Sequence, residues 1–183
     1  VGEAALYGPK LDIQIRNVHG KEDTLITLQI DQMLAEKFGM EYVDADGTKK
    51  NPYIIHRTSI GCYERTLALL LEKYAGALPL WLMPTQVKVL PIGERHHEYA
   101  RALGEKLSAA GIRVEVDDRN EKIGYKIREA QLKKTPYMLV CGDKEVESGE
   151  VSVRHRSKGD LGSMGSDAFL ELALKEIREK TID

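Results

Sequence analysis

The sequence has little cysteine and few aromatic residues. Of its 183 residues, two are cysteine and 6% are aromatic. Cys62 and Cys141 follow neither a disulfide nor a metal-binding spacing, which is typical of a reducing compartment such as the cytoplasm. No apolar run approaches the roughly 18 residues of a membrane span, and nothing at the N-terminus resembles a signal peptide. These absences argue against secreted disulfide-rich and membrane-spanning classes and favour a cytoplasmic protein.

What the sequence does contain is typical of a globular protein with one or two domains. Apolar residues make up 42% and charged residues 31% of the chain, and 183 residues can bury a sizeable core. The net charge of −2 does not by itself indicate a nucleic-acid partner. Because the chain begins at Val1 and enters strand-like sequence at once, we expect a piece of a longer protein.

The first part of the sequence predicts an antiparallel sheet with one long helix. Alternating apolar residues predict strands at residues 11–15, 25–31 and 53–57. A helical period follows Gly61 and ends at Gly76. Three strands and one helix would leave an apolar sheet face or edge exposed. The missing part of a larger sheet is therefore expected upstream.

The second part predicts a different class, a small mixed, mostly parallel α/β domain. We expect a linker at residues 80–86, because two prolines interrupt the pattern around it. Strands and helices then alternate. Strands are predicted at 87–92, 113–117, 137–141 and 151–156, and helices at 96–110, 123–134 and after Ser166. The fold class is therefore α/β in two parts.

Positive charge gathers in the second part. Residues 119–134 contain six basic and two acidic residues, a local charge of +4, and residues 154–158 form a second basic cluster. Spacings of 4, 7 and 11 residues place Lys122, Lys126, Glu129 and Lys133 along one helix face. Such a stripe could bind a polyanion. Alternatively, it is an ordinary solvated helix face.

A short motif opens the long helix of the first part. The run Ile60-Gly-Cys-Tyr-Glu-Arg65 resembles Gly-x-x-Glu-Arg, the third class-defining motif of class II aminoacyl-tRNA synthetases. Longer segments, in the same order and spacing, resemble the threonyl-tRNA synthetase family within that class. They include Tyr7-Gly-Pro-Lys10, Ile55-His-Arg57, Arg119-Asn-Glu-Lys-Ile-Gly-Tyr-Lys-Ile-Arg128, Pro136-Tyr-Met-Leu-Val-Cys-Gly-Asp-Lys-Glu-Val146 and Val151-Ser-Val-Arg154.

The resemblance covers nearly the whole chain and implies its organisation and activity. Residues 1–79 would be the end of a class II catalytic domain and residues 87–183 an anticodon-binding domain, together a C-terminal fragment. The parent would be a threonine–tRNA ligase that uses ATP with magnesium, zinc and tRNA, and would be a homodimer. The chain alone is expected to bind tRNA but to lack full catalysis, because part of the active site lies upstream.

The resemblance also implies roles for residues of the first part. Tyr7, Lys10, Gln29 and Asp31 match positions that line the amino-acid pocket. Arg65 matches the arginine that contacts ATP, and a planar guanidinium can pair with phosphate and stack on a purine. His56 matches one of three zinc ligands, whose other two would lie upstream.

In the second part, Asn120, Lys122, Glu145 and Arg154 match positions that contact the anticodon bases. Their residue types suit base reading, because they supply donors and acceptors to base edges. Arg128 is expected to contact the phosphate backbone or to serve the fold of the domain. Two alternatives remain open from the sequence: a stand-alone, non-catalytic tRNA-binding protein, and a structural remnant without a ligand.

Overall fold

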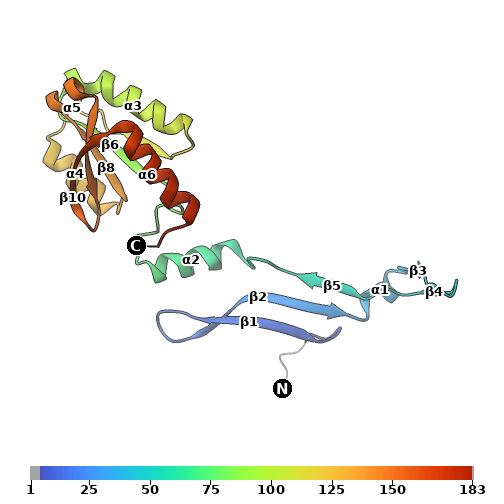
Figure 1. Cartoon of the computed structure of the whole chain (residues 1–183). Helices are drawn as coiled ribbons and strands as arrows, with labels where there is room; N and C mark the ends of the chain where they lie inside the picture. The colour runs from blue at the N-terminus through green and yellow to red at the C-terminus, as the bar shows by residue number, and fades with distance from the viewer. Residues whose placement is uncertain (1–4, 183) are drawn as a thin grey trace. The chain divides into compact units, whose positions relative to one another are not determined.

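The computed structural model describes residues 5–182, so residues 1–4 and 183 of the two expected domains lie outside it. The chain divides into two compact units, Val1–Ala75 and Gly76–Asp183 (Figure 1). The change of unit falls before the expected linker at 80–86. The side chains of Leu80 and Met83 are buried, and Gln86 Nε2 donates to Leu80 O at 2.9 Å. This segment is therefore packed within the second unit.

The first unit is built on a three-stranded antiparallel sheet in the order β1-β2-β5. The three predicted strands and the long helix are confirmed, and a two-stranded ribbon, β3–β4, was not predicted. The elements are β1 (Lys10–Arg16), β2 (Glu22–Asp31), α1 (Leu34–Lys37), β3 (Tyr42–Val43), β4 (Lys49–Lys50), β5 (Ile54–Arg57) and α2 (Tyr63–Lys73).

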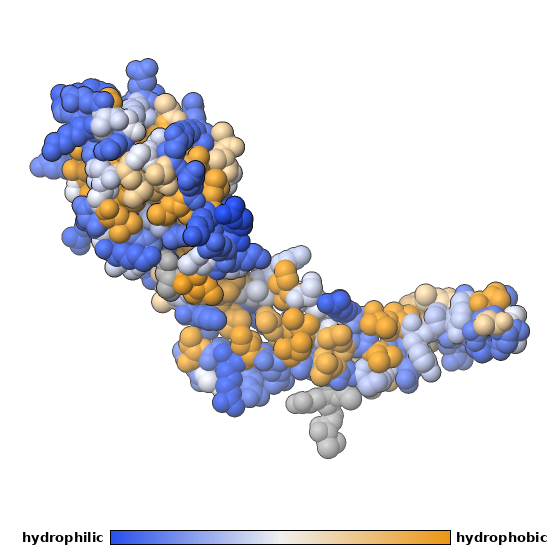
Figure 2. All heavy atoms as spheres, viewed as in Figure 1, coloured by the Kyte–Doolittle hydropathy of each residue, from blue (hydrophilic) through white to orange (hydrophobic). Residues whose placement is uncertain are grey.

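This sheet has one polar and one apolar face, because side chains alternate along each strand and cross-strand partners share a face. Lys10, Gln29 and His56 form one row across the three strands. On the opposite face, Leu11 and Ile55 are 61% and 69% exposed. Figure 2 shows hydrophobic residues gathered along this unit. The expected exposure of an apolar face is thus confirmed.

The second unit contains a five-stranded sheet in the order β10-β9-β8-β6-β7. Its strands are β6 (Val87–Pro91), β7 (Val114–Val116), β8 (Tyr137–Cys141), β9 (Glu150–His155) and β10 (Gly159–Gly165). Its helices are η1 (Glu94–His96), α3 (His97–Ala109), α4 (Ile123–Leu132), α5 (Asp143–Ser148) and α6 (Ser166–Glu179).

The sheet of the second unit is mixed, with two parallel and two antiparallel pairings. The parallel part is β7-β6-β8, as the strand–helix alternation predicts. The expectation of a mostly parallel sheet is corrected by β10, an antiparallel edge strand that sequence reading missed. Three glycines among its seven residues hide the alternation that marks a strand. Helix α5 was missed as well.

Helices cover both faces of this sheet. Along β8, Leu139 belongs to a core with Leu103 of α3 and Phe169 of α6. The preceding residue of the strand, Met138, packs instead with Leu90 of β6 and with Ala130 of α4. Because neighbouring residues of a strand point to opposite faces, α3 and α6 lie on one face and α4 on the other.

Within the described residues, no helix is both long and apolar enough to span a bilayer.

Candidate nucleic-acid interface

The loop between β7 and α4 carries two of the predicted base-reading residues. Asn120 and Lys122 are exposed, and within residues 5–182 neither side chain has a hydrogen-bond partner. Lys122 is the N-cap of α4, and its carbonyl accepts from Tyr125 N at 2.9 Å. Ile123 and Ile127 anchor the helix on the sheet. The loop therefore presents a free amide and a free ammonium from a packed support.

The exposed charged stripe predicted on α4 is wrong at its centre. Lys126 is only 1% exposed, and its Nζ donates to Pro91 O at 3.0 Å and to Asp117 O at 2.9 Å. Burial lowers the pKa of Lys126, and the nearby charge of Asp117 opposes this shift. Lys126 faces inward because it lies three residues after Ile123 and four before Ala130, both of which pack inward.

Arg154 lies on the face of the sheet that α4 covers. It is the cross-strand partner of Met138 in β8 and of Asp160 in β10, and cross-strand partners share a face. Its Nη1 lies 3.1 Å from Asp160 Oδ2. The side chain remains about one-third exposed. A guanidinium is thus displayed on the sheet beside α4 with one carboxylate partner.

The second predicted basic cluster, residues 154–158, is split by strand alternation. His155 is buried, and its ring packs edge-on against Tyr137. Arg156 Nη1 donates to Leu78 O at 2.6 Å and to Lys134 O at 3.2 Å, which ties the segment before β6 to the end of α4. Two members of this cluster therefore serve the fold.

Glu145 lies in α5, which follows the carboxyl end of β8. Its carboxylate accepts from Gly142 N at 2.9 Å, which caps the start of the helix through the glutamate alone, because glycine has no side chain to return the contact. Glu145 is half-buried, whereas Arg128 on α4 is exposed. Glu145 therefore has a structural contact in addition to any contact with a ligand.

The structure places three of these residues at one edge of the sheet and Arg154 apart from them. Asn120, Lys122 and Glu145 follow the carboxyl ends of β7 and β8, which meet at one edge because both strands run parallel to β6. Arg154 is paired with Met138, three residues before the end of β8. At about 3.3 Å per residue, it lies roughly 10 Å along the strand from that edge. Arg154 is thus set back from the edge where the other three residues lie.

The polar face of the first unit gathers the predicted amino-acid pocket. Tyr7 Oη donates to Gln29 Oε1 at 2.6 Å, and the rings of Tyr7 and His56 lie 5.8 Å apart. Lys10 Nζ pairs with Asp12 at 2.7 Å. Tyr7 can approach β2 because Gly8 follows it: a Cβ there would meet Ile30 O at 2.0 Å. Glycine permits this close approach because it has no Cβ.

Asp31 is buried at the end of β2. Its Oδ1 accepts from Met33 N at 2.9 Å and Leu34 N at 2.8 Å, and its Oδ2 lies 3.1 Å from His56 Nε2. Burial raises the pKa of Asp31, but the hydrogen bonds from Leu34, Met33 and His56 outweigh burial and leave this pKa below its ordinary value. Asp31 is therefore held as a carboxylate that both starts α1 and orients His56.

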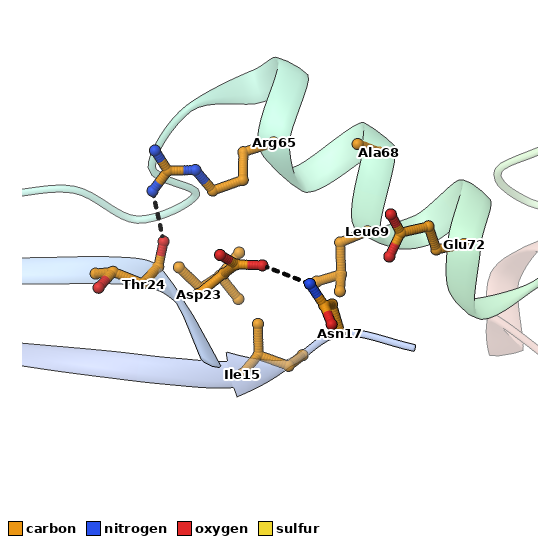
Figure 3. Close-up of a pocket in the computed structure, with 9 residues that line it drawn as sticks. Ile15, Asn17, Asp23, Thr24, Arg65, Ala68, Leu69 and Glu72 are labelled. Atoms are coloured by element: carbon orange, nitrogen blue, oxygen red, sulfur yellow. Dashed lines mark hydrogen bonds between the residues drawn. The ribbon is translucent and has the colours of Figure 1, made fainter. Parts of the chain in front are cut away.

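Arg65 lies in the first turn of α2, beside a pocket at the turn end of β1 and β2 (Figure 3). Its Nη1 donates to Thr24 O at 2.9 Å. Glycine at position 61 allows the approach of this loop, because a Cβ there would meet Leu25 O at 2.2 Å. The pocket is lined by Ile15, Asn17, Asp23, Thr24, Leu25, Arg65, Ala68, Leu69 and Glu72.

The described residues do not fit a zinc site by themselves. Catalytic zinc takes three protein ligands, and within residues 5–182 no group of three or more His, Cys, Asp or Glu side chains could hold a metal ion. His56 Nε2 faces the carboxylate of Asp31 instead. The chemistry proposed for this chain therefore uses no zinc.

Two family models divide the chain as its two units do. Residues 86–177 match the family described as "Anticodon binding domain", and residues 2–74 match "tRNA synthetase class II core domain (G, H, P, S and T)". The chain therefore belongs to the class II aminoacyl-tRNA synthetases, with an anticodon-binding domain after part of the core. The resemblance seen in the sequence motifs is confirmed.

Individual relatives carry a more particular name. The chain is 62% identical over 178 residues to "Threonine--tRNA ligase" of Clostridium botulinum strain Eklund 17B, covering 97% of this chain and 28% of that protein. It is 53% identical over 181 residues to "Threonine--tRNA ligase" of Caldanaerobacter subterraneus subsp. tengcongensis, covering 99% and 28%. The chain thus spans 28% of the length of these curated relatives.

A solved structure supports the fold. The RNA binding domain of threonyl-tRNA synthetase from Cryptosporidium parvum Iowa II matches with a TM-score of 0.85 and 35% identity, over 95% of this chain and 44% of that one. The α/β class in two parts is thereby confirmed.

Proposed function

We propose that this chain binds the anticodon arm of threonine tRNA through residues 86–177 and supplies part of the active site of a threonine–tRNA ligase. The observation that carries the proposal is the pair of unpartnered, exposed side chains of Asn120 and Lys122 at the sheet edge. They lie within the segment that matches the anticodon-binding family. Arg154 extends the contact surface along the face beside α4.

The residue types suit distinct parts of the RNA. The Asn120 amide can donate to and accept from one base edge, and the Lys122 and Arg154 side chains donate to base acceptors. The Glu145 carboxylate can accept from an amino group with the oxygen that Gly142 does not use. Arg128 is placed to contact phosphate. Such contacts give affinity that falls with salt, in addition to sequence selection.

In the first unit, we propose that Tyr7, Lys10, Gln29 and Asp31 line the amino-acid side of the site and Arg65 the ATP side. The reaction joins the threonine carboxylate to the α-phosphate of magnesium-bound ATP and releases pyrophosphate. The threonyl group then passes to a terminal ribose hydroxyl of tRNA, and AMP leaves. We place the protein in the cytoplasm, as a homodimer when the remaining part of the catalytic domain is present.

Binding to an RNA stem-loop with a threonine anticodon, compared with the same stem-loop carrying one substituted anticodon base, tests the proposal. Lys122→Ala and Arg154→Ala should each weaken cognate binding by roughly 5- to 150-fold, the effect of about 1–3 kcal/mol per base contact, and reduce discrimination. Lys175→Ala is the matched control, since Lys175 is exposed on α6 across the sheet. Unchanged discrimination by both variants would refute the anticodon assignment.

A further inference from the structure

Lys126 joins the ends of two strands to the helix that carries it. Its ammonium is buried and donates to the carbonyls of Pro91, at the end of β6, and Asp117, just after β7. A buried ammonium is stable only with such acceptors. Because Lys126 lies in the first turns of α4, this one side chain holds the start of the helix against the carboxyl edge of the sheet.

Asp117 and Arg119 form a second connection at the same place. Arg119 Nε and Nη2 donate to the two oxygens of Asp117 at 2.8 and 2.7 Å, a bidentate pair. Arg119 also pairs with Glu129 of α4, and the ammonium of the buried Lys88 lies 3.6 Å from Asp117. The side chain of Arg119 therefore connects the end of β7 with α4.

The two connections meet at the loop of residues 118–122, which contains Asn120 and Lys122. The side chain of Lys126 bonds to the carbonyl of Asp117, just before this loop, and Lys126 itself belongs to α4, which follows the loop. Asp117 and Arg119 fix the first residues of the loop from the strand side. The loop is thus held at both ends without any contact from the side chains of Asn120 and Lys122.

We propose that Lys126 and the Asp117–Arg119 pair are positioning residues that hold the loop of residues 118–122 in the conformation that presents Asn120 and Lys122 to RNA bases. The part of this inference that concerns RNA rests on the proposed function. A loop held in its bound conformation loses less entropy on binding. Removing the connections should therefore weaken recognition although none of these groups touches a base.

Direct phosphate binding by Arg119 is the competing explanation, because its side chain is 49% exposed. The two explanations differ in salt dependence. Loss of a phosphate contact lowers the slope of log affinity against log salt by about 0.7–0.9. Loss of a positioning residue leaves that slope unchanged.

The experiment compares Lys126→Met and Arg119→Gln with Lys133→Met, which removes an exposed lysine at the C-cap of α4. In the free protein, the amides of Glu121 and Tyr125, which donate to Arg119 O at 2.8 Å and to Lys122 O at 2.9 Å, should exchange at least 10-fold faster in the first two variants and normally in the third. Amides of β8 should stay protected, which shows that the unit is folded. Arg119→Lys should partly restore protection, since one hydrogen bond to Asp117 can form.

The second measurement is affinity for the cognate stem-loop at several salt concentrations. Both variants should bind roughly 10-fold more weakly with an unchanged salt slope. In a background that carries both Asn120→Ala and Lys122→Ala, their effect should largely disappear, because the side chains that they position are absent. Lys126→Met tests a buried site; if it loses β8 protection, Arg119→Gln at the half-exposed position decides the question.

Unchanged exchange of the Glu121 and Tyr125 amides overturns the proposal, as does a fall in the salt slope or full additivity with the Asn120→Ala and Lys122→Ala pair. If the unmodified protein does not select the cognate stem-loop, the proposed function fails and the RNA part of this inference fails with it. Hydrogen exchange measured without RNA still decides whether the loop is held as described.

Discussion

Arg154 and Asp160 face each other across the β9–β10 pair, with Nη1 of the arginine 3.1 Å from Oδ2 of the aspartate. The aspartate side chain is 56% exposed, so the pair lies at the surface. An exposed pair of this kind contributes little to stability, about 0–1 kcal/mol. Its larger effect is to place a negative charge next to a guanidinium that we propose binds RNA.

Asp160→Asn should therefore strengthen RNA binding. Removing the carboxylate of Asp160 frees the Arg154 side chain and removes a negative charge that repels phosphates. We therefore expect affinity for the cognate stem-loop to rise about 2- to 5-fold at low salt. Fluorescence anisotropy of labelled RNA measures the change. The control is Asp167→Asn on α6, which removes an exposed carboxylate paired with Lys106 of α3. Equal effects of the two substitutions would show that only net charge matters.

Arg128→Gln should lower affinity equally for cognate and substituted stem-loops. Arg128 is exposed on α4, and we propose that it contacts phosphate, so the salt slope should fall by about 0.7–0.9. Arg178→Gln on α6 is the matched control, because α6 covers the opposite face of the sheet. A loss of discrimination in Arg128→Gln would instead indicate that Arg128 reads a base.

Gly8→Ala should displace Tyr7 from β2. The added Cβ would meet Ile30 O at 2.0 Å, and a main-chain atom cannot move aside cheaply. The bonds from Ile30 N to Pro9 O and from Gln32 N to Tyr7 O should open, and the exchange of these two amides should accelerate at least 10-fold. Gly20→Ala is the control, since nothing lies within 4 Å of its Cβ. Equal exchange in both variants would contradict the close-approach explanation.

The sequence predicted the second unit well where apolar runs have clear boundaries. Strand β8, residues 137–141, was predicted to the residue because five largely apolar residues lie between Pro136 and Gly142. Strand β10 could not be found in this way. Its glycines and polar residues acquire strand structure from pairing with β9, which is a tertiary effect.

The burial of charged side chains was the least predictable property of the candidate site. Spacing along α4 fixes the direction of Lys126, but burial depends on the carbonyls at the ends of β6 and β7, which only the folded sheet brings together. The sequence does carry a signal for the inward direction, because Lys126 falls on the same helix face as Ile123, Ile127 and Ala130. The ion pair of Asp117 with Lys88, by contrast, could not be predicted, because Lys88 lies on a strand that is distant in the sequence.

Asp117 makes the second unit sensitive to acid. Hydrogen bonding from Arg119 lowers the pKa of Asp117 to about 2, against the opposing effect of burial and with help from Lys88. The folded state thus binds this proton more weakly than the unfolded chain, whose carboxyl has a pKa of 3.8. The resulting stabilisation, on the order of 2 kcal/mol, is present above pH 3.8 and is lost as the pH falls toward 2.

Asp117→Asn should remove this part of the acid sensitivity and should destabilise the unit at neutral pH by about 3 kcal/mol, because Lys88 and Arg119 lose a buried partner. Trp81, the single tryptophan, belongs to the second unit, so its fluorescence during urea unfolding reports that unit. Between pH 4 and 2 the unfolding free energy of the variant should fall less steeply than that of the unmodified protein.

Asp118→Asn, which removes an exposed carboxylate paired with Arg101, is the control. Parallel pH profiles for the Asp117→Asn protein and the unmodified protein would show that Asp117 is not the group responsible.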